Sequence, residues 1–415
     1  MPSKTLAQAA ATLRSRLDRL SRVSDERGAT TRTFLSPAMR RANALVAGWM
    51  RAAGLSVRED FAGNLIGRKE CAAAGAKTLL LGSHLDTVRD AGRFDGTLGV
   101  LLPIAALEVL RARGVNLPFA VEVLGFSEEE GVRFSSAYLG SKGYSGRLRK
   151  SDLRLRDQAG VSVGEALRAH SRGKLRIPPA AHARGELLGY IEAHIEQGPV
   201  LEARGLAAGV VPAIAGQTRA RILFKGRAGH AGTTPMALRR DALAGAAEFI
   251  VAVEAYARAR KPLVATVGRI EARPGAANVV PGAVELTLDV RHPADPGRRA
   301  AFAGLRRSAG AIAARRGLLL SVEVTQDNGA VACSGELTAL LARSVRARQG
   351  NCLAVPSGAG HDAVILSSLT PVTMLFVRCR EGLSHHPDEH VHPRDLRLAL
   401  DILVDFLTRL ASPPG

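Results

Sequence analysis

The sequence contains few cysteines, few aromatic residues and no long apolar run. Its four cysteines are spread over 415 residues and never form a C-x-x-C pair, so we expect buried thiols rather than a disulfide framework or a zinc ribbon. No apolar run approaches the ~18 to 20 residues that a membrane span needs. Residues 1–20 repeat leucine at helical spacing and lack the apolar centre and cleavage site of a signal peptide. We therefore predict an N-terminal amphipathic helix and a cytoplasmic protein without a membrane partner.

Acidic residues are also scarce. The chain has 38 acidic against 57 basic residues and a net charge of +19, which by itself would favour a nucleic-acid partner. The basic residues are spread along the whole chain, and only residues 147–184 concentrate them, without an aromatic side chain on which a base could stack. We therefore expect a solvated basic face and no nucleic-acid partner, with polyanion binding by residues 147–184 as the alternative. Attraction of a small anionic substrate is compatible with both.

The length and the order of the predicted elements indicate two domains. A chain of 415 residues exceeds what one hydrophobic core usually supports. Its middle predicts the order β-α-β-β-α-β of a split β-α-β, ferredoxin-like domain. The strands are expected at 217–225, 262–271, 283–291 and 318–325, and the helices at 238–258 and 295–316. We therefore predict an inserted α+β domain at 213–330 and a discontinuous α/β domain formed by 1–212 and 331–415.

Metal-type ligands follow the predicted strands of the α/β domain. A strand at 78–82, a helix at 96–113 and a strand at 118–126 form a β-α-β unit, whose strands should be parallel. Further elements are expected as a strand at 371–377 and helices at 336–349 and 396–410. Ligands in open α/β sheets bind at the carboxyl edge of the strands. Side chains that are remote in the sequence should therefore meet at this edge.

The candidate ligands satisfy the needs of two divalent ions. Such a pair, about 3.5 to 4 Å apart, requires a bridging carboxylate and about two further ligands on each ion. Asp95 could bridge, with His84 and His194 on one ion and Glu130 and His385 on the other. Nitrogen and oxygen ligands without thiolates suit Zn, Mn, Co or Ni. His386 directly follows His385 and is an alternative ligand that the sequence leaves open.

The neighbouring carboxylates have other predicted roles. Three consecutive glutamates cannot all bind metal, because adjacent side chains diverge. Glu130 is assigned as the ligand, Glu129 as the general base that takes a proton from water, and Glu128 as a structural or solvated carboxylate. Asp86, two residues after His84, is expected to accept the ring N–H of that histidine and to fix its orientation.

The inserted domain offers groups for a substrate that carries a carboxylate. His230 lies in a glycine-rich segment and could donate to a developing oxyanion. Gln217, Asn278 and Arg291 offer two amides and one bidentate guanidinium. These four residues are therefore candidates for contact with the substrate.

Eight motifs carry a resemblance to a known family. They are Gly82-Ser83-His84-Leu85-Asp86-Thr87, Gly92-Arg93-Phe94-Asp95-Gly96, Glu129-Glu130-Gly131-Val132-Arg133-Phe134, His194-Ile195-Glu196-Gln197-Gly198-Pro199, Gly229-His230-Ala231-Gly232-Thr233-Thr234-Pro235-Met236, Asn278-Val279-Val280-Pro281-Gly282, Ser357-Gly358-Ala359-Gly360-His361-Asp362-Ala363 and Gly382-Leu383-Ser384-His385. Together they resemble the amidase and carbamoylase branch of the M20 metallopeptidase family over nearly the whole chain. In peptidases of the wider family, a carboxylate takes the place of His194.

The resemblance implies a fold, an assembly and a site. A phosphorylase/hydrolase-like catalytic domain with a mixed sheet would hold two metal ions, and the inserted domain would be a lid that also forms a homodimer. His230, Asn278 and Arg291 would then reach the substrate from the partner subunit, and Gly358 would join the substrate site. The motif register favours His385 over His386 as the ligand.

The resemblance also implies the reaction. The expected activity is hydrolysis of the terminal ureido C–N bond of allantoate, with release of ammonia and carbon dioxide. N-carbamoyl-L-amino acids and β-ureidopropionate are the alternative substrates. A family member that has lost catalysis and serves as a binding protein is the alternative from another class, although the candidate ligands and base are all present.

Overall fold

The computed structural model describes residues 5–412 except 74, 174–175 and 184. The chain folds into two compact units. Unit 1 comprises Met1–Pro212, Cys333–Val355 and Gly360–Gly415, and unit 2 comprises Ala213–Ala332 and Pro356–Ala359. The expected N-terminal helix is α1, Leu6–Ser21, and the first residues of that prediction lie outside the described part. In the described part, no helix combines the length and the apolarity that a bilayer span requires.

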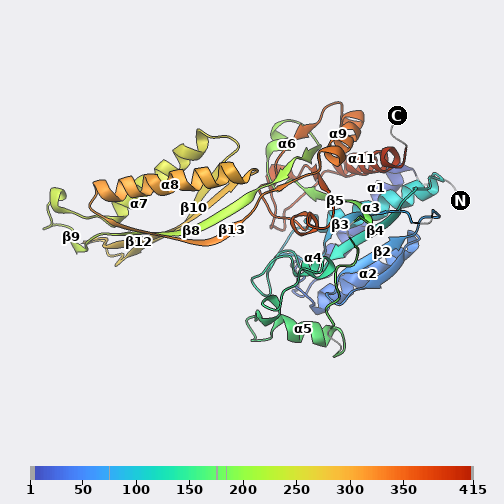
Figure 1. Cartoon of the computed structure of the whole chain (residues 1–415), viewed down its shortest axis with the longest axis horizontal. Coiled ribbons are helices and arrows are strands. Elements are labelled where there is room, and N and C mark those ends of the chain that lie inside the picture. Colours follow the sequence, from blue (N-terminus) through green and yellow to red (C-terminus); the bar gives the residue numbers. More distant parts are fainter. Residues whose placement is uncertain (1–4, 74, 174–175, 184, 413–415) are drawn as a thin grey trace. The chain divides into compact units, whose positions relative to one another are not determined.

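Unit 1 is built on a mixed sheet with the strand order β1-β2-β4-β3-β5-β16-β6-β15. Figure 1 labels its strands β2, β3, β4 and β5. The strands are β1 Ser56–Glu59, β2 Leu65–Lys69, β3 Thr78–His84, β4 Ala120–Phe126, β5 Leu187–Ile195, β6 Ala208–Val211, β15 Leu353–Ala354 and β16 Val372–Val377. The four central strands β4, β3, β5 and β16 are parallel, whereas β2 joins β4 and β6 joins β16 antiparallel. The central strands are almost wholly buried, as expected for a sheet that is covered on both faces.

Unit 1 contains further helices, several of which complete the main core. They are α2 Pro37–Ala52, α3 Thr97–Ala112, α4 Leu139–Tyr144, α5 Val163–His170, α6 Val200–Ala203, α9 Gly335–Gln349, α10 Ala363–Leu366 and α11 Pro393–Ala411. The helix α3 connects β3 to β4 and packs against α1 and α11. The predicted β-α-β unit is confirmed by the parallel pairing of β3 with β4. The sequence analysis did not predict α2, β1 and β2. We had expected all four cysteines to be buried, but only Cys379 is buried, and the other three are partly exposed.

Unit 2 is an antiparallel sheet with two helices. Its main elements are β8 Gly216–Lys225, α7 Ala242–Arg258, β10 Val264–Arg273, β12 Ala283–His292, α8 Asp295–Arg315 and β13 Leu319–Asn328, and the strand order is β10-β12-β8-β13. This is the order of a ferredoxin-like domain, as predicted. The helix α7 begins later than expected, because the Asp241 side chain accepts the amides of Leu243 and Ala244 and caps it there.

A buried glutamate ties the long connection between β4 and β5 to the sheet. Glu122, on β4, is 2% exposed and accepts hydrogen bonds from Arg68 at 3.1 Å and from Tyr144 at 2.7 Å. His182 lies 3.2 Å away on the same connection. Burial alone would raise the pKa of Glu122, but the bonds from His182, Tyr144 and Arg68 lower it to about 2. The carboxylate is therefore charged in the folded chain and holds three segments together.

Replacing Glu122 by glutamine should destabilise unit 1. The pKa of this carboxyl is about 2 in the folded chain against an ordinary value of 4.5. The carboxylate therefore contributes about 3 kcal/mol to the free energy of unfolding above pH ~4.5, and this contribution is lost as the pH falls toward ~2. Urea unfolding of the wild type and Glu122→Gln should show the difference at pH 7 and a smaller one at pH 3. Glu70→Gln, which removes an exposed partner of Arg68, is the control; an equal Glu122→Gln effect at both pH values would contradict the account.

Candidate active site

The parallel strands of unit 1 bring five predicted ligands to one edge of the sheet. His84 is the last residue of β3, and His194 lies one residue before the end of β5. Glu130 follows β4, and His385 follows β16. Asp95 precedes Gly96, the N-cap residue of α3. Because the strands are parallel and adjacent, their carboxyl ends place these side chains together.

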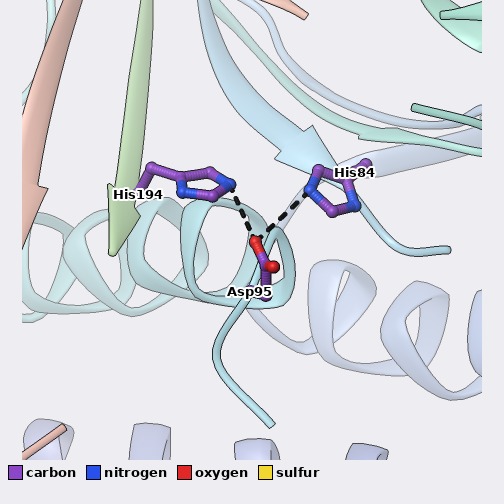
Figure 2. A group of neighbouring side chains, drawn as sticks. All are labelled: His84, Asp95 and His194. Atoms are coloured by element: carbon purple, nitrogen blue, oxygen red, sulfur yellow. Dashed lines mark ion pairs between the residues drawn. The ribbon is translucent and has the colours of Figure 1, made fainter. Parts of the chain in front are cut away.

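Two histidines face one oxygen of Asp95 (Figure 2). The distance from Nε2 to Asp95 Oδ1 is 3.2 Å for His194 and 3.8 Å for His84. All three side chains are at most 3% exposed. Figure 2 shows the rings approaching the carboxylate from the ends of two strands, with Asp95 beside the first turn of α3.

The hydrogen bonds of the two rings fix which nitrogen faces Asp95. Nδ1 of His84 lies 3.0 Å from the carbonyl oxygen of Asp86, and Nδ1 of His194 lies 3.0 Å from that of Ile195. A carbonyl oxygen only accepts, so Nδ1 carries the proton, and in a neutral ring Nε2 presents a lone pair. Among the described residues, Nε2 of His194 has no hydrogen-bond partner. A lone pair that faces a carboxylate oxygen is stabilised when a cation lies between them, so this pair of rings fits a metal ion.

The other oxygen of Asp95 faces a second group. Nε2 of His385 lies 3.1 Å from Asp95 Oδ2 and 3.5 Å from Glu130 Oε1. The ligand atoms of Asp95, Glu130 and His385 all lie within 4.8 Å of one another, as do those of His84, Asp95 and His194. His386 instead turns toward Asp388, with Nδ1 3.8 Å from its carboxylate. Each oxygen of Asp95 thus belongs to a different triad, which is the arrangement that a bridging carboxylate requires.

Asp86 organises the acidic turn that follows β4. Its carboxylate accepts the amide N–H of Glu129 at 3.1 Å and that of Glu130 at 3.1 Å. Its Oδ1 is 3.5 Å from Nδ1 of His84, farther than the Asp86 backbone oxygen at 3.0 Å. From the sequence we expected the Asp86 carboxylate to orient the ring of His84. In the structure, the Asp86 backbone oxygen makes the shorter contact with His84. The Asp86 carboxylate instead accepts the amides of Glu129 and Glu130.

Several buried carboxylates crowd this edge of the sheet. Burial raises the pKa of Glu129 and of Glu128 well above the usual range. Burial and the charge of Asp95 raise the pKa of Glu130 to about 7. Burial and the charge of Glu192 raise that of Asp362 well above its ordinary value. Such crowding of negative charge favours the binding of cations.

Three residues that sequence reasoning did not assign hold Asp95 in place. Ser384 Oγ donates to Asp95 Oδ2 at 2.9 Å, and the Gln197 amide donates to the same oxygen at 3.1 Å. Glu389 accepts the amide of Asp95 at 3.1 Å and that of Phe94 at 2.7 Å. Ser384 and Gln197 lie inside motifs that the sequence had already singled out. Glu389 lies four residues beyond the last of those motifs, and its contact with the Asp95 loop exists only in the folded chain.

Tyr138 and His361 also line this region. Tyr138 has a left-handed backbone, with φ 69°, and its amide donates to the carbonyl of Glu129 at 3.2 Å. Its hydroxyl occupies the space that a Cβ at Gly360 would need. The ring of His361 lies 4.5 Å from that of His194, and burial together with the charge of His194 lowers the pKa of His361 well below its ordinary value. A left-handed tyrosine tied to Glu129 is strain of the kind that clusters at functional sites.

Unit 2 places two of its predicted substrate residues together. Gln217 and Arg291 are paired across β8 and β12, and both donate to Asp289, at 2.7 Å and 3.0 Å. Arg291 also donates to the carbonyl of Gly358 at 2.7 Å. The sequence interpretation had put Gly358 in the α/β domain. It belongs to unit 2, because the neighbouring Ser357 pairs with the start of that unit.

His230 and Asn278 form a separate group within unit 2. The Asn278 carbonyl accepts the amide of Ala231 at 2.9 Å, and His230 pairs with Val279 between the short strands β9 Gly229–His230 and β11 Val279–Val280. These strands lie beyond the end of β8, whereas Gln217 lies at its start (Figure 1). At about 3.3 Å per residue, the length of β8 separates the two groups by roughly 25 Å within one copy.

Comparisons with known proteins show which family the chain resembles. The model of peptidase family M20/M25/M40 matches residues 80–409. Allantoate deiminase of Arabidopsis thaliana is 42% identical, over 95% of this chain and 81% of the relative. N-carbamoyl-L-amino acid amidohydrolase of Geobacillus stearothermophilus is 40% identical, over 93% and 94% of the two chains. A solved amidase of the hydantoinase/carbamoylase family from Burkholderia multivorans superposes with a TM-score of 0.91 at 32% identity, covering 98% of both chains.

Proposed function

The chain belongs to peptidase family M20/M25/M40, and we propose that it is a metal-dependent amidohydrolase that cleaves the terminal ureido C–N bond of allantoate. The observation that carries the proposal is the pair of triads that share Asp95, one oxygen to each. His84, Asp95, Glu130, His194 and His385 would hold two divalent ions, with Zn or Mn first and Co or Ni as alternatives. The relatives named for allantoate and for N-carbamoyl-L-amino acids support a ureido substrate.

In this proposal, the residues of unit 1 hold the metal ions and transfer the proton. When bound, two divalent ions would polarise the ureido carbonyl and acidify a water molecule. Glu129 takes the proton from the attacking water and returns it to the departing nitrogen, so that ammonia leaves. The carbamate that forms decomposes to carbon dioxide and an amine. The Asp86 carboxylate fixes the backbone of Glu129 and Glu130 by accepting their amide hydrogen bonds.

The residues of unit 2 would bind the substrate from two copies of the chain. Arg291 and Gln217 offer a guanidinium and an amide to the substrate carboxylate, and His230 would donate to the developing oxyanion. The separation of roughly 25 Å along β8 is too large for one copy to place Arg291 and His230 on the same small molecule. We therefore revise the expectation that His230, Asn278 and Arg291 all come from one partner subunit. In a homodimer, one copy would supply Arg291 and the other His230 and Asn278.

Arg291→Lys should raise the KM for allantoate by roughly tenfold to a hundredfold, because an ammonium cannot make the bidentate contact of a guanidinium. The kcat should change much less, because the contact exists in both the ground state and the transition state. Steady-state ammonia release gives both constants. Arg221→Lys, an exposed position on β8 that pairs with Glu323, is the matched control. An unchanged KM in Arg291→Lys would remove this residue from the substrate site.

The choice of substrate is tested by a panel of ureido compounds. Metal-loaded protein should release ammonia from allantoate with a higher kcat/KM than from N-carbamoyl-L-amino acids or β-ureidopropionate. A preference for a carbamoyl amino acid would contradict the assignment of allantoate as the substrate and leave the proposed mechanism unchanged. Failure to hydrolyse any of them with a full metal complement would favour an inactive homologue that binds ureido compounds.

A further inference from the structure

A hollow of about 580 Å³ lies between the first and the last helix of unit 1. Its lining consists of Ala7, Ala10, Ala11, Arg14, Ser15, Asp18, Arg19 and Arg22 of the N-terminal segment and Pro393, Leu396 and Arg397 of α11. None of these residues belongs to the two triads at the sheet edge. The hollow follows α1 for most of its length, which at 1.5 Å per residue is roughly 20 Å.

The two ends of the hollow differ in chemistry. Toward the start of α1 the lining residues are small: Ala10 is buried, and Ala7 and Ala11 are exposed. Toward the end of α1 the lining includes Arg14, Arg19 and Arg22. An elongated ligand with an apolar end and an anionic end would match this division.

The arginines of the hollow have no acidic partner in the described part of the chain. Arg14, Arg19, Arg22 and Arg397 are exposed, and none of them takes part in an ion pair between described residues. The one acid in the lining, Asp18, is already paired with Arg93 at 2.7 Å. Four guanidinium groups are therefore left to face a shared concave surface. Among the described residues of 147–184, by contrast, Arg156 is paired with Glu165.

The charge of Arg14 also acts on His390. Burial lowers the pKa of His390, and the charges of Arg380, Arg93, His392 and Arg14 lower it further. Of these cations, Arg14 lines the hollow. Guanidinium groups bind phosphate oxygens in pairs of parallel hydrogen bonds, and clusters of them are typical of phosphate sites.

We propose that this hollow binds an organic phosphate, with the phosphate held by the arginines and the apolar part resting on the alanines. The ligand class is a nucleoside monophosphate or a molecule of the same build. The site is separate from the proposed active site and would exist whether or not the chain hydrolyses allantoate.

Calorimetric titration of the metal-loaded protein with AMP at low salt tests the proposal, with adenosine and inorganic phosphate as partial probes. AMP should bind more tightly than either. Arg14→Ser combined with Arg397→Ser should weaken AMP binding on the order of a hundredfold, at roughly tenfold for each guanidinium removed. Arg51→Ser combined with Arg343→Ser removes the same charge from two exposed positions outside the hollow and should leave the affinity within about twofold.

A steric variant keeps the test independent of charge. Ala11→Leu fills the apolar end at an exposed helical position, so it should weaken AMP binding and leave the affinity for inorganic phosphate unchanged. Retained AMP binding in both the arginine pair and Ala11→Leu would assign the phosphate to the metal centre and overturn the proposal. Absence of AMP binding in the wild type would overturn it as well.

Discussion

Glu129→Gln should lower the kcat for ureido hydrolysis by about a thousandfold, within the 10² to 10⁴ range for loss of a general acid–base group. Glutamine keeps the shape of the side chain, and the amide hydrogen bond from residue 129 to Asp86 is a backbone bond that survives the change. What is lost is the capacity to take a proton from water and return it to the leaving nitrogen. Single-turnover ammonia release, with the bound metal measured on the same samples, separates this loss from a loss of ions.

Glu128→Gln is the matched control for this experiment. Glu128 is also buried and adjacent, but its carboxylate accepts the amide of Gly131 at 2.5 Å, and a glutamine carbonyl can accept that bond. We expect Glu128→Gln to retain most of the activity. Equal losses in the two variants, or substantial turnover by Glu129→Gln, would contradict the assignment of the base.

His385→Ala should lose one of two bound ions and about a thousandfold of the activity, because it removes a ligand from one triad only. The other triad keeps His84, Asp95 and His194, whose side chains are buried. Metal analysis of the purified variant should therefore give about one ion per chain, against two in the wild type, if each triad holds one ion as proposed.

The adjacent histidine provides the control. His386 is exposed and lies beside Asp388 rather than the triads. His386→Ala should keep both ions and nearly full activity. The reverse pattern, with loss in His386→Ala and none in His385→Ala, would show that the ligand is the second histidine of the pair.

The sequence alone predicted the parts of the fold that depend on local patterns. The apolar runs at Thr78–His84 and Val372–Val377 are buried central strands, and buried parallel strands have continuous apolar sequences. The strands of unit 2 instead alternate between buried and more exposed residues, which is the pattern of an antiparallel sheet with one covered face. The edge strand β1 was missed, because Ser56–Glu59 is largely exposed and has no apolar pattern to detect. The neighbouring strand β2 was missed as well, and it has only five residues.

The sequence predicted those residues of the candidate site that lie at or just after the ends of strands. His84, His194, Glu130 and His385 follow or end parallel strands, so their convergence is a consequence of topology. The contacts of Glu389 with the Asp95 loop join residues that are 294 positions apart, and no local pattern indicates them. The separation of Arg291 from His230 depends on the register of β8 with β12, which only the structure supplies.

The most direct test of the central claim is a titration of metal-depleted protein with Mn²⁺ or Zn²⁺, with ammonia release from allantoate followed at each step. The account predicts that hydrolysis is absent without metal and reaches its maximum as the second ion per chain binds. Full turnover by metal-free protein would contradict it, and so would a lack of turnover on every ureido substrate at two ions per chain.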